Sequence, residues 1–118
     1  MSSSRSENAP SELFEGGYYS IADGEQFGIA KLLKLDPDIA HVRIYKERFS
    51  QRPRAIDITR LTLGSVDDKE GYGMGHIPLR LATFQQWQPL FLAYSEVKDE
   101  ELEAYEVWRA SSNGGPVE

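Results

Sequence analysis

The sequence predicts one small, mainly β domain of the α+β class, either a small SH3-like barrel or a bent antiparallel sheet, that carries a C-terminal helix. Three apolar stretches with strand-type alternation, joined by turn signals, run from residue 18 to residue 49. A single helix-type stretch closes the chain at residues 99–110. The 118 residues, 40% of them hydrophobic, are enough for one domain with its own core.

Residues 18–22 combine aromatic and β-branched side chains and predict the first strand. Asp23-Gly24 is a strong hairpin signal between apolar runs, so we expect residues 27–35 to form the second strand. Strict alternation in that strand places five side chains on one face: Phe27, Ile29, Lys31, Leu33 and Leu35.

A second turn, at residues 36–38, contains a proline and precedes a third strand at residues 39–49. Alternation directs Val42 and Ile44 to one face and His41, Arg43 and Tyr45 to the other. His41 is therefore expected at the surface or boundary of the strand. The three strands together predict an antiparallel meander.

The middle of the chain is less regular. Residues 51–54 predict a basic loop, and the alternation at residues 56–58 and 60–63 predicts two short strands. Glycines and charged residues predict a long loop over residues 64–76. We expect an edge strand at residues 77–81, because Pro78 cannot donate to a neighbouring strand.

A short helical turn and a further strand are predicted next. Thr83 and Gln86 have the spacing of a capping box, with Thr83 as N-cap, and Pro89 stops the helix after one turn. Residues 90–94 then form another strand.

The C-terminal helix is predicted at residues 99–110, where Leu102, Tyr105 and Trp108 form a narrow apolar stripe that docks on the sheet. The folded domain therefore spans residues 13–110. The polar tails at residues 1–12 and 111–118 are expected to be disordered, because they have almost nothing to bury.

Composition excludes several function classes. Cysteine is absent, which excludes disulfides, zinc sites with cysteine ligands, iron–sulfur clusters and thiol catalysis. No apolar run is long enough for a transmembrane helix, and no secretory signal is visible at the N-terminus. We expect a cytoplasmic protein without a cofactor or a metal, and without a membrane partner.

No residue is predicted to be catalytic. Tyr72 and His76, in and after the glycine loop, are loop candidates, but His76 has no paired Ser, Asp or Glu at a recognisable spacing. The acids Asp67, Asp68 and Glu70 lack the ligand spacing of a calcium loop. The glycine spacing also differs from that of phosphate-binding loops.

Charge is distributed unevenly along the chain. Residues 31–60 have a net charge of +4, whereas the remainder has −10. Aromatic side chains lie within the basic stretch, which is typical of a binding face. The candidate binding residues are Tyr19, Phe27, Arg43, Tyr45, Arg48, Arg52 and Arg54.

Two family resemblances begin at the run of residues 19–31. It resembles the opening of SH3-like barrels of the Tudor kind, in which a strand, an Asp-Gly turn, an aromatic residue and a second strand recur; residues 42–45 correspond to the third strand, followed here by Lys46-Glu47. The same run is similar to bacterial immunity proteins of the immunity protein 26 family, and residues 75–79 resemble a later strand of that family.

We therefore expect a non-catalytic module with a protein partner, in its sharpest form an immunity-type inhibitor that sequesters a toxin by charge complementarity. One alternative is a Tudor-like reader of a modified basic side chain, built on Tyr19, Phe27 and Tyr45, or a nucleic-acid binder that uses the basic face. A second alternative is a small enzyme that uses His76. The sequence leaves the oligomeric state open.

Overall fold

The computed structural model describes residues 12–64 and 73–110. Five strands form one antiparallel sheet with the order β4-β3-β2-β1-β5. The strands are β1 (Gly17–Asp23), β2 (Gln26–Asp36), β3 (Ile39–Phe49), β4 (Met74–Arg80) and β5 (Leu90–Tyr94). Two α-helices, α1 (Leu81–Gln86) and α2 (Glu103–Ala110), and two 3₁₀ turns, η2 (Ile58–Arg60) and η3 (Asp99–Leu102), complete the fold.

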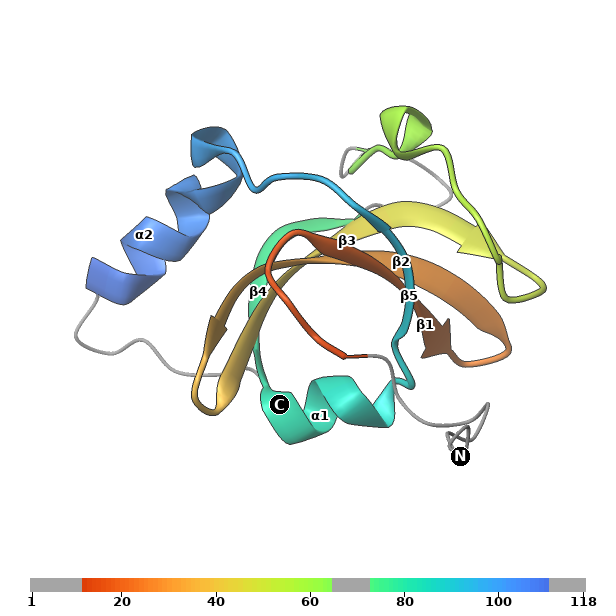
Figure 1. The fold of residues 1–118 in the computed structure, drawn as a ribbon, viewed down its shortest axis with the longest axis horizontal. Coiled ribbons are helices and arrows are strands. Elements are labelled where there is room, and N and C mark those ends of the chain that lie inside the picture. Colours follow the sequence, from red (N-terminus) through yellow and green to blue (C-terminus); the bar gives the residue numbers. More distant parts are fainter. Residues whose placement is uncertain (1–11, 65–72, 111–118) are drawn as a thin grey trace, which may run out of the picture.

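The sheet is bent but open (Figure 1). The predicted bent antiparallel sheet with a C-terminal helix is confirmed. The closed SH3-like barrel is not observed, because β4 and β5 remain the two edges of the sheet. α1 lies inside the curve of the sheet, whereas η3 and α2 lie outside it at one end (Figure 1).

The predicted meander is formed by β1, β2 and β3. Gly24, with a φ of 63°, makes the turn between β1 and β2, which explains why the Asp-Gly pair is effective there. The 11-residue strands β2 and β3 pair along their length and form the centre of the sheet.

Each face of the sheet carries a separate core. The concave face packs against Phe84 of α1, and its centre is Tyr19, which is fully buried. On the convex face a smaller core forms around Tyr18, Ile29 and Tyr45, beneath the segment that contains η2. A sheet covered on both faces explains why β2 has few polar positions.

The predicted alternation of β2 is wrong beyond Leu33. The register with β3 shifts between Leu32 and Lys34, so one extra residue is inserted in β2. Such a bulge reverses the direction of every later side chain. Leu35 consequently packs in the concave core, on the opposite side of the sheet from Lys31.

The two short strands predicted at residues 56–58 and 60–63 are wrong. The Asp57 carboxylate accepts hydrogen bonds from the Thr59 N–H (3.1 Å) and from the Thr59 hydroxyl (2.6 Å), which turns the chain into η2. The long loop predicted up to residue 76 ends earlier, because Met74 already pairs with Ile44 of β3. Pro78 does lie in an edge strand, as predicted.

The short helix α1 exists, but Thr83 is not its N-cap. The helix begins at Leu81, and its N-cap, Arg80, makes no side-chain capping bond. Instead, the Leu81 N–H donates to the carbonyl of Asp38 (2.9 Å), a tertiary contact that the local sequence does not reveal. Gln88, with a φ of 57°, and Pro89 end the turn and lead into β5.

The C-terminal helix has a 3₁₀ first turn, η3, followed by α2. Tyr105 is buried, Leu102 and Trp108 are half-buried, and Glu100, Glu103 and Glu106 are exposed, which is the predicted orientation of the stripe. Within the described residues, no helix has both the length and the apolar character needed to cross a membrane. The tails predicted to be disordered lie, except for Glu12, outside the described residues.

Candidate functional site: the seam between the sheet and the C-terminal helix

The C-terminal helix contacts the convex face of the sheet through aromatic rings and histidines. Tyr105 and Trp108 approach the ring of His41 edge-on, with ring centroids 4.7 and 4.6 Å away. His76, on the neighbouring strand β4, lies 6.2 Å from Tyr105 and 6.5 Å from Trp108. Lys34 adds a cation 6.0 Å above the Tyr105 ring. The helix therefore covers polar as well as apolar groups of the sheet.

Under this helix, Asp36, His41 and His76 form a hydrogen-bonded chain, which we call the histidine relay. His41 Nε2 lies 2.9 Å from Asp36 Oδ2, and His41 Nδ1 lies 3.0 Å from His76 Nε2. The two imidazole planes differ by only 8°. The ring centroids are 5.2 Å apart, whereas the two hydrogen-bonded nitrogens are 3.0 Å apart. This difference is about two ring radii, so the rings lie end to end in one plane.

The relay determines which nitrogen carries each proton. An ionised carboxylate can only accept, so His41 Nε2–H donates to Asp36. Neutral His41 then accepts at Nδ1, and His76 Nε2–H is the donor. The lone pair of His76 Nδ1 remains at the end of the chain. A first proton, added at His76 Nδ1, preserves both hydrogen bonds. A second proton, added at His41 Nδ1, would place two N–H groups opposite each other and break the hydrogen bond between the histidines.

The environment favours neutral imidazoles. Burial, together with a smaller effect of the neighbouring His41, lowers the pKa of His76 to about 4. Burial also lowers the pKa of His41, although the hydrogen bond to Asp36 partly opposes this effect. His41 is fully buried, so its predicted position at the strand surface is wrong.

A buried ion pair lies beside the relay. The Lys31 ammonium donates to both carboxylate oxygens of Glu101 (2.9 and 3.1 Å) and to the Glu96 carbonyl (3.1 Å). The Lys31 side chain is only 2% exposed, and its nitrogen lies 5.1 Å above the Tyr18 ring. All three ammonium donors are thus used, as a buried charge requires.

Glu101 connects the start of the C-terminal helix to this lysine. Burial alone would raise the pKa of Glu101, but the Lys98 N–H (2.8 Å) and then Lys31 and Arg43 hold it below its ordinary value. Arg43 lies 4.0 Å from Glu101 and donates from Nε to the Gly75 carbonyl (3.2 Å). Residues of β2, β3, β4 and η3 therefore meet in one network.

A pocket of about 400 Å³ opens above this network, between η2 and the start of η3. Both charge signs and three hydroxyl-bearing side chains line it: Tyr18, Lys31, Arg43, Ile58, Thr59, Ser95, Lys98, Glu100 and Glu101. Two other pockets, of about 480 and 350 Å³, lie near the β1–β2 hairpin. Neither histidine lines any of these three, so the relay supplies a possible base without a described cleft for a substrate.

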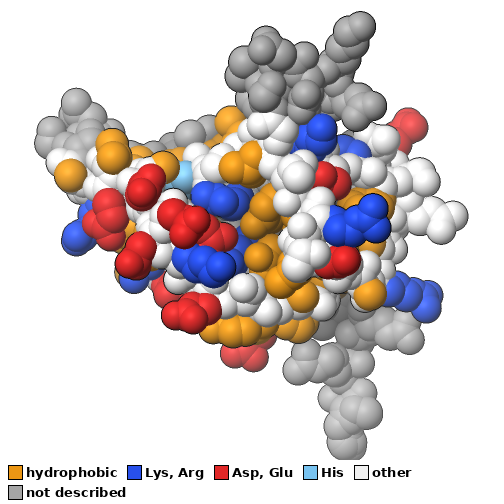
Figure 2. Space-filling view, turned by 90° about the horizontal axis from the view of Figure 1, so that it is seen from above, with side chains coloured by type: hydrophobic (Ala, Val, Ile, Leu, Met, Phe, Trp, Pro, Cys, Tyr) orange, Lys and Arg blue, Asp and Glu red, His pale blue; other side chains and the backbone are white. Residues whose placement is uncertain are grey.

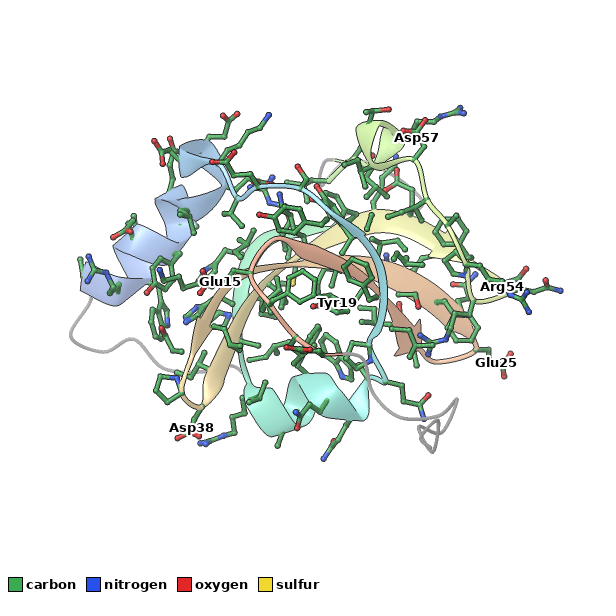
Figure 3. The ribbon with its side chains drawn as sticks, viewed as in Figure 1. Glu15, Tyr19, Glu25, Asp38, Arg54 and Asp57 are labelled. Atoms are coloured by element: carbon green, nitrogen blue, oxygen red, sulfur yellow. The ribbon has the colours of Figure 1, made fainter. Side chains whose placement is uncertain are left out.

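The predicted aromatic binding residues do not come together. Tyr19 is in the concave core (Figure 3), where its hydroxyl donates to the Glu12 carbonyl. Tyr45 stacks on Tyr18 on the convex side, where burial raises its pKa and Tyr18 raises it further. Phe27 lies beneath the guanidinium of Arg52, 4.8 Å away. An aromatic cage needs its rings around one opening, and this arrangement does not provide one.

The predicted basic residues mostly bind the protein itself. Arg48 donates to the Asp23 carboxylate (2.7 Å) and to the Tyr45 carbonyl (2.7 Å). Arg52 donates to the Ser20 hydroxyl (2.6 Å) and to the Gln88 carbonyl (3.0 Å), and burial lowers its pKa. Arg43 belongs to the Glu101 network, and Arg54 points outward at the end opposite α2 (Figure 3). Tyr72 lies outside the described residues.

Sequence reasoning missed Lys31, His41 and Glu101 as members of one site. The alternation of β2 does place Lys31 on a face with Ile29, which is a sign of a buried lysine that needs a partner. No local pattern identifies Glu101, 70 residues away, as that partner.

The exposed side of η3 and α2 is acidic. Figure 2 shows acidic side chains gathered at the end of the molecule that carries α2, with lysine and arginine side chains among them. Asp99, Glu100 and Glu103 are exposed and form no ion pair within the described residues, whereas Glu106 pairs with Arg109 (3.2 Å). No group of three potential metal ligands occurs among the described side chains.

Comparison of the chain with known protein families, with curated proteins and with solved structures gave no match.

Proposed function

We propose that the chain is a non-catalytic protein-binding module whose outer η3–α2 surface receives a basic partner. The observation that supports this most directly is the contrast between the two sets of charges. The arginines at positions 43, 48 and 52 are engaged within the protein, whereas Asp99, Glu100 and Glu103 are exposed and pair with no cation in the described part of the chain. Exposed charges of one sign steer a partner of the other sign.

An apolar side chain lies within this acidic surface. Val107 is 72% exposed and follows Glu103 by one helical turn. A central apolar contact surrounded by charged groups is the usual composition of a protein interface. A nucleic acid would be repelled by the same carboxylates, which favours a protein partner.

In its sharpest form, the proposal is an immunity-type inhibitor that sequesters a basic toxin domain. The similarity of residues 19–31 to the immunity protein 26 family supports this form, together with the acidic surface. The adjacent reading frame is the place to search for the partner, because a toxin and its inhibitor need to be produced together.

The test measures binding to the product of the adjacent reading frame by titration calorimetry at low and high salt. Glu103→Lys reverses one charge of the acidic surface, and Glu25→Lys makes the same change in the exposed β1–β2 turn at the other end of the molecule (Figure 3). We expect Glu103→Lys to weaken binding by about tenfold or more, and Glu25→Lys by less than about twofold.

Two results would count against the proposal. One is tight binding that neither salt nor Glu103→Lys changes, which would place the interface elsewhere. The other is binding of a fluorescent single-stranded oligonucleotide but not of the neighbouring protein, which would favour the nucleic-acid alternative.

A further inference from the structure

A second surface, on the side of β5, has the opposite character. Residues 81–95, which contain α1 and β5, include no Asp, Glu, Lys, Arg or His, although 27% of the chain is charged. Edge strands usually carry charged side chains that prevent pairing with another sheet, and β5 is an edge strand of this sheet. The absence of charge there therefore needs a physical reason.

Three exposed aromatic side chains gather at this edge. Phe14 is 38% exposed, Phe91 43% and Tyr94 58%. The Phe14 ring lies 5.3 Å from that of Phe91 and 6.1 Å from that of Tyr94, and the buried Tyr19 ring supports Phe14 and Phe91 from below. We call Phe14, Phe91 and Tyr94 the aromatic edge.

The aromatic edge is held in place by the fold. Tyr94 lies against Gly16, where an added Cβ would come within 2.5 Å of the Tyr94 ring. Gly16 has a φ of 96°, a conformation that glycine adopts without strain. Rings that are already ordered lose little entropy when a partner covers them, which favours binding.

We propose that the aromatic edge, with β5, is the interface of a twofold-symmetric dimer of this chain. The protein has a net charge of −6, so two copies repel each other wherever their carboxylates meet. The uncharged 81–95 segment avoids that repulsion. An antiparallel pairing of β5 with its copy would bring the two aromatic edges together by symmetry.

The placement of other charges agrees with a second copy of the chain at this surface. Glu15, next to Phe14, is directed toward β2, where its carboxylate accepts the Leu35 N–H (2.9 Å). The acidic α2 lies at the end of the molecule away from β5 (Figure 1), so the acidic surfaces of the two copies would remain apart.

Sedimentation velocity of the full chain over a range of concentrations tests the dimer. We expect a concentration-dependent dimer, and we expect Tyr94→Lys to weaken it about 30-fold or more while leaving unchanged the melting temperature of the monomer, measured at a concentration too low for dimers. Val107→Lys introduces the same charge at an exposed apolar site on α2 and should leave the dissociation constant of the dimer unchanged.

A chain that stays monomeric at the highest concentrations overturns the proposal, as does a dimer that persists in Tyr94→Lys. A dimer lost in Val107→Lys would move the interface to α2. A chain that dimerises only after deletion of residues 1–11 would show that its own N-terminal segment covers the aromatic edge instead.

Discussion

Replacing Glu101 by glutamine should weaken the docking of the C-terminal helix, because it removes the charge that compensates buried Lys31. The Lys31 side chain is 2% exposed, and two of its three hydrogen-bond acceptors belong to the Glu101 carboxylate. Removing one partner of a buried ion pair costs about 3–5 kcal/mol. Glutamine keeps one acceptor oxygen, worth about 1 kcal/mol, so we expect a loss of about 2–4 kcal/mol.

The segment that carries Glu101 can also leave the sheet and let water reach Lys31, so the loss cannot exceed the free energy of helix docking. Urea unfolding is therefore monitored by two probes, far-UV circular dichroism for the sheet and Trp108 fluorescence for the helix. A Trp87→Phe background makes the fluorescence specific to Trp108. If docking is the weaker step, Glu101→Gln shifts the fluorescence transition and leaves the sheet transition nearly unchanged.

Glu103→Gln is the matched control, because it removes the same charge from an exposed position of the same helix and should change stability by less than about 0.5 kcal/mol. In a Lys31→Met background, Glu101→Gln should cost less than about 1 kcal/mol, since no buried ammonium remains to be compensated. Equal effects of Glu101→Gln and Glu103→Gln on both probes would refute the reasoning.

Three further predictions concern the same fold. Trp108→Ala should lower the free energy of unfolding in urea by about 2–3 kcal/mol, less than the loss at a fully buried tryptophan, because the ring is half-buried. The control Val107→Ala, at an exposed position, should cost under about 0.5 kcal/mol. Equal costs would show that the stripe is not docked. Gly73→Ala should cost at least about 2 kcal/mol, because its Cβ would overlap the carbonyl oxygen of Ile44. Gly75→Ala is the control: its Cβ would meet only a side-chain carbon of Leu63 at 3.8 Å, so it should be nearly neutral in the same assay. The histidine relay should make helix docking sensitive to acid. The pKa values of His41 and His76 are lowered in the folded state, so the unfolded chain binds protons first as the pH falls. The relay's contribution to stability is therefore complete above pH 6.5 and declines as the pH falls toward about 4. The partial exposure of His76 reduces the expected loss of docking free energy to about 1–2 kcal/mol. A Trp108 fluorescence signal that is constant between these pH values would contradict this prediction.

The elements that local pattern predicted well are those whose structure depends on neighbours in sequence. Alternating side chains and the Asp23-Gly24 turn define the first hairpin, because a period of two and a residue with positive φ are both local properties. The stripe of Leu102, Tyr105 and Trp108 likewise follows from helical periodicity alone. Residues 90–94 are apolar between a proline and polar residues, which was sufficient to predict β5 with its observed bounds.

Tertiary structure alone decided where the pattern is interrupted and which distant residues meet. The bulge at Leu33 arises from pairing between two strands, and it reverses side-chain direction without any local signal. The partners His41 and His76 are 35 residues apart, and Lys31 and Glu101 are 70 apart, so each pair exists only because the sheet and the helix bring them together. A charged or polar side chain is satisfied wherever the fold supplies a partner, and for this reason the sequence determined the strands and the helix, while packing determined which polar groups form the site.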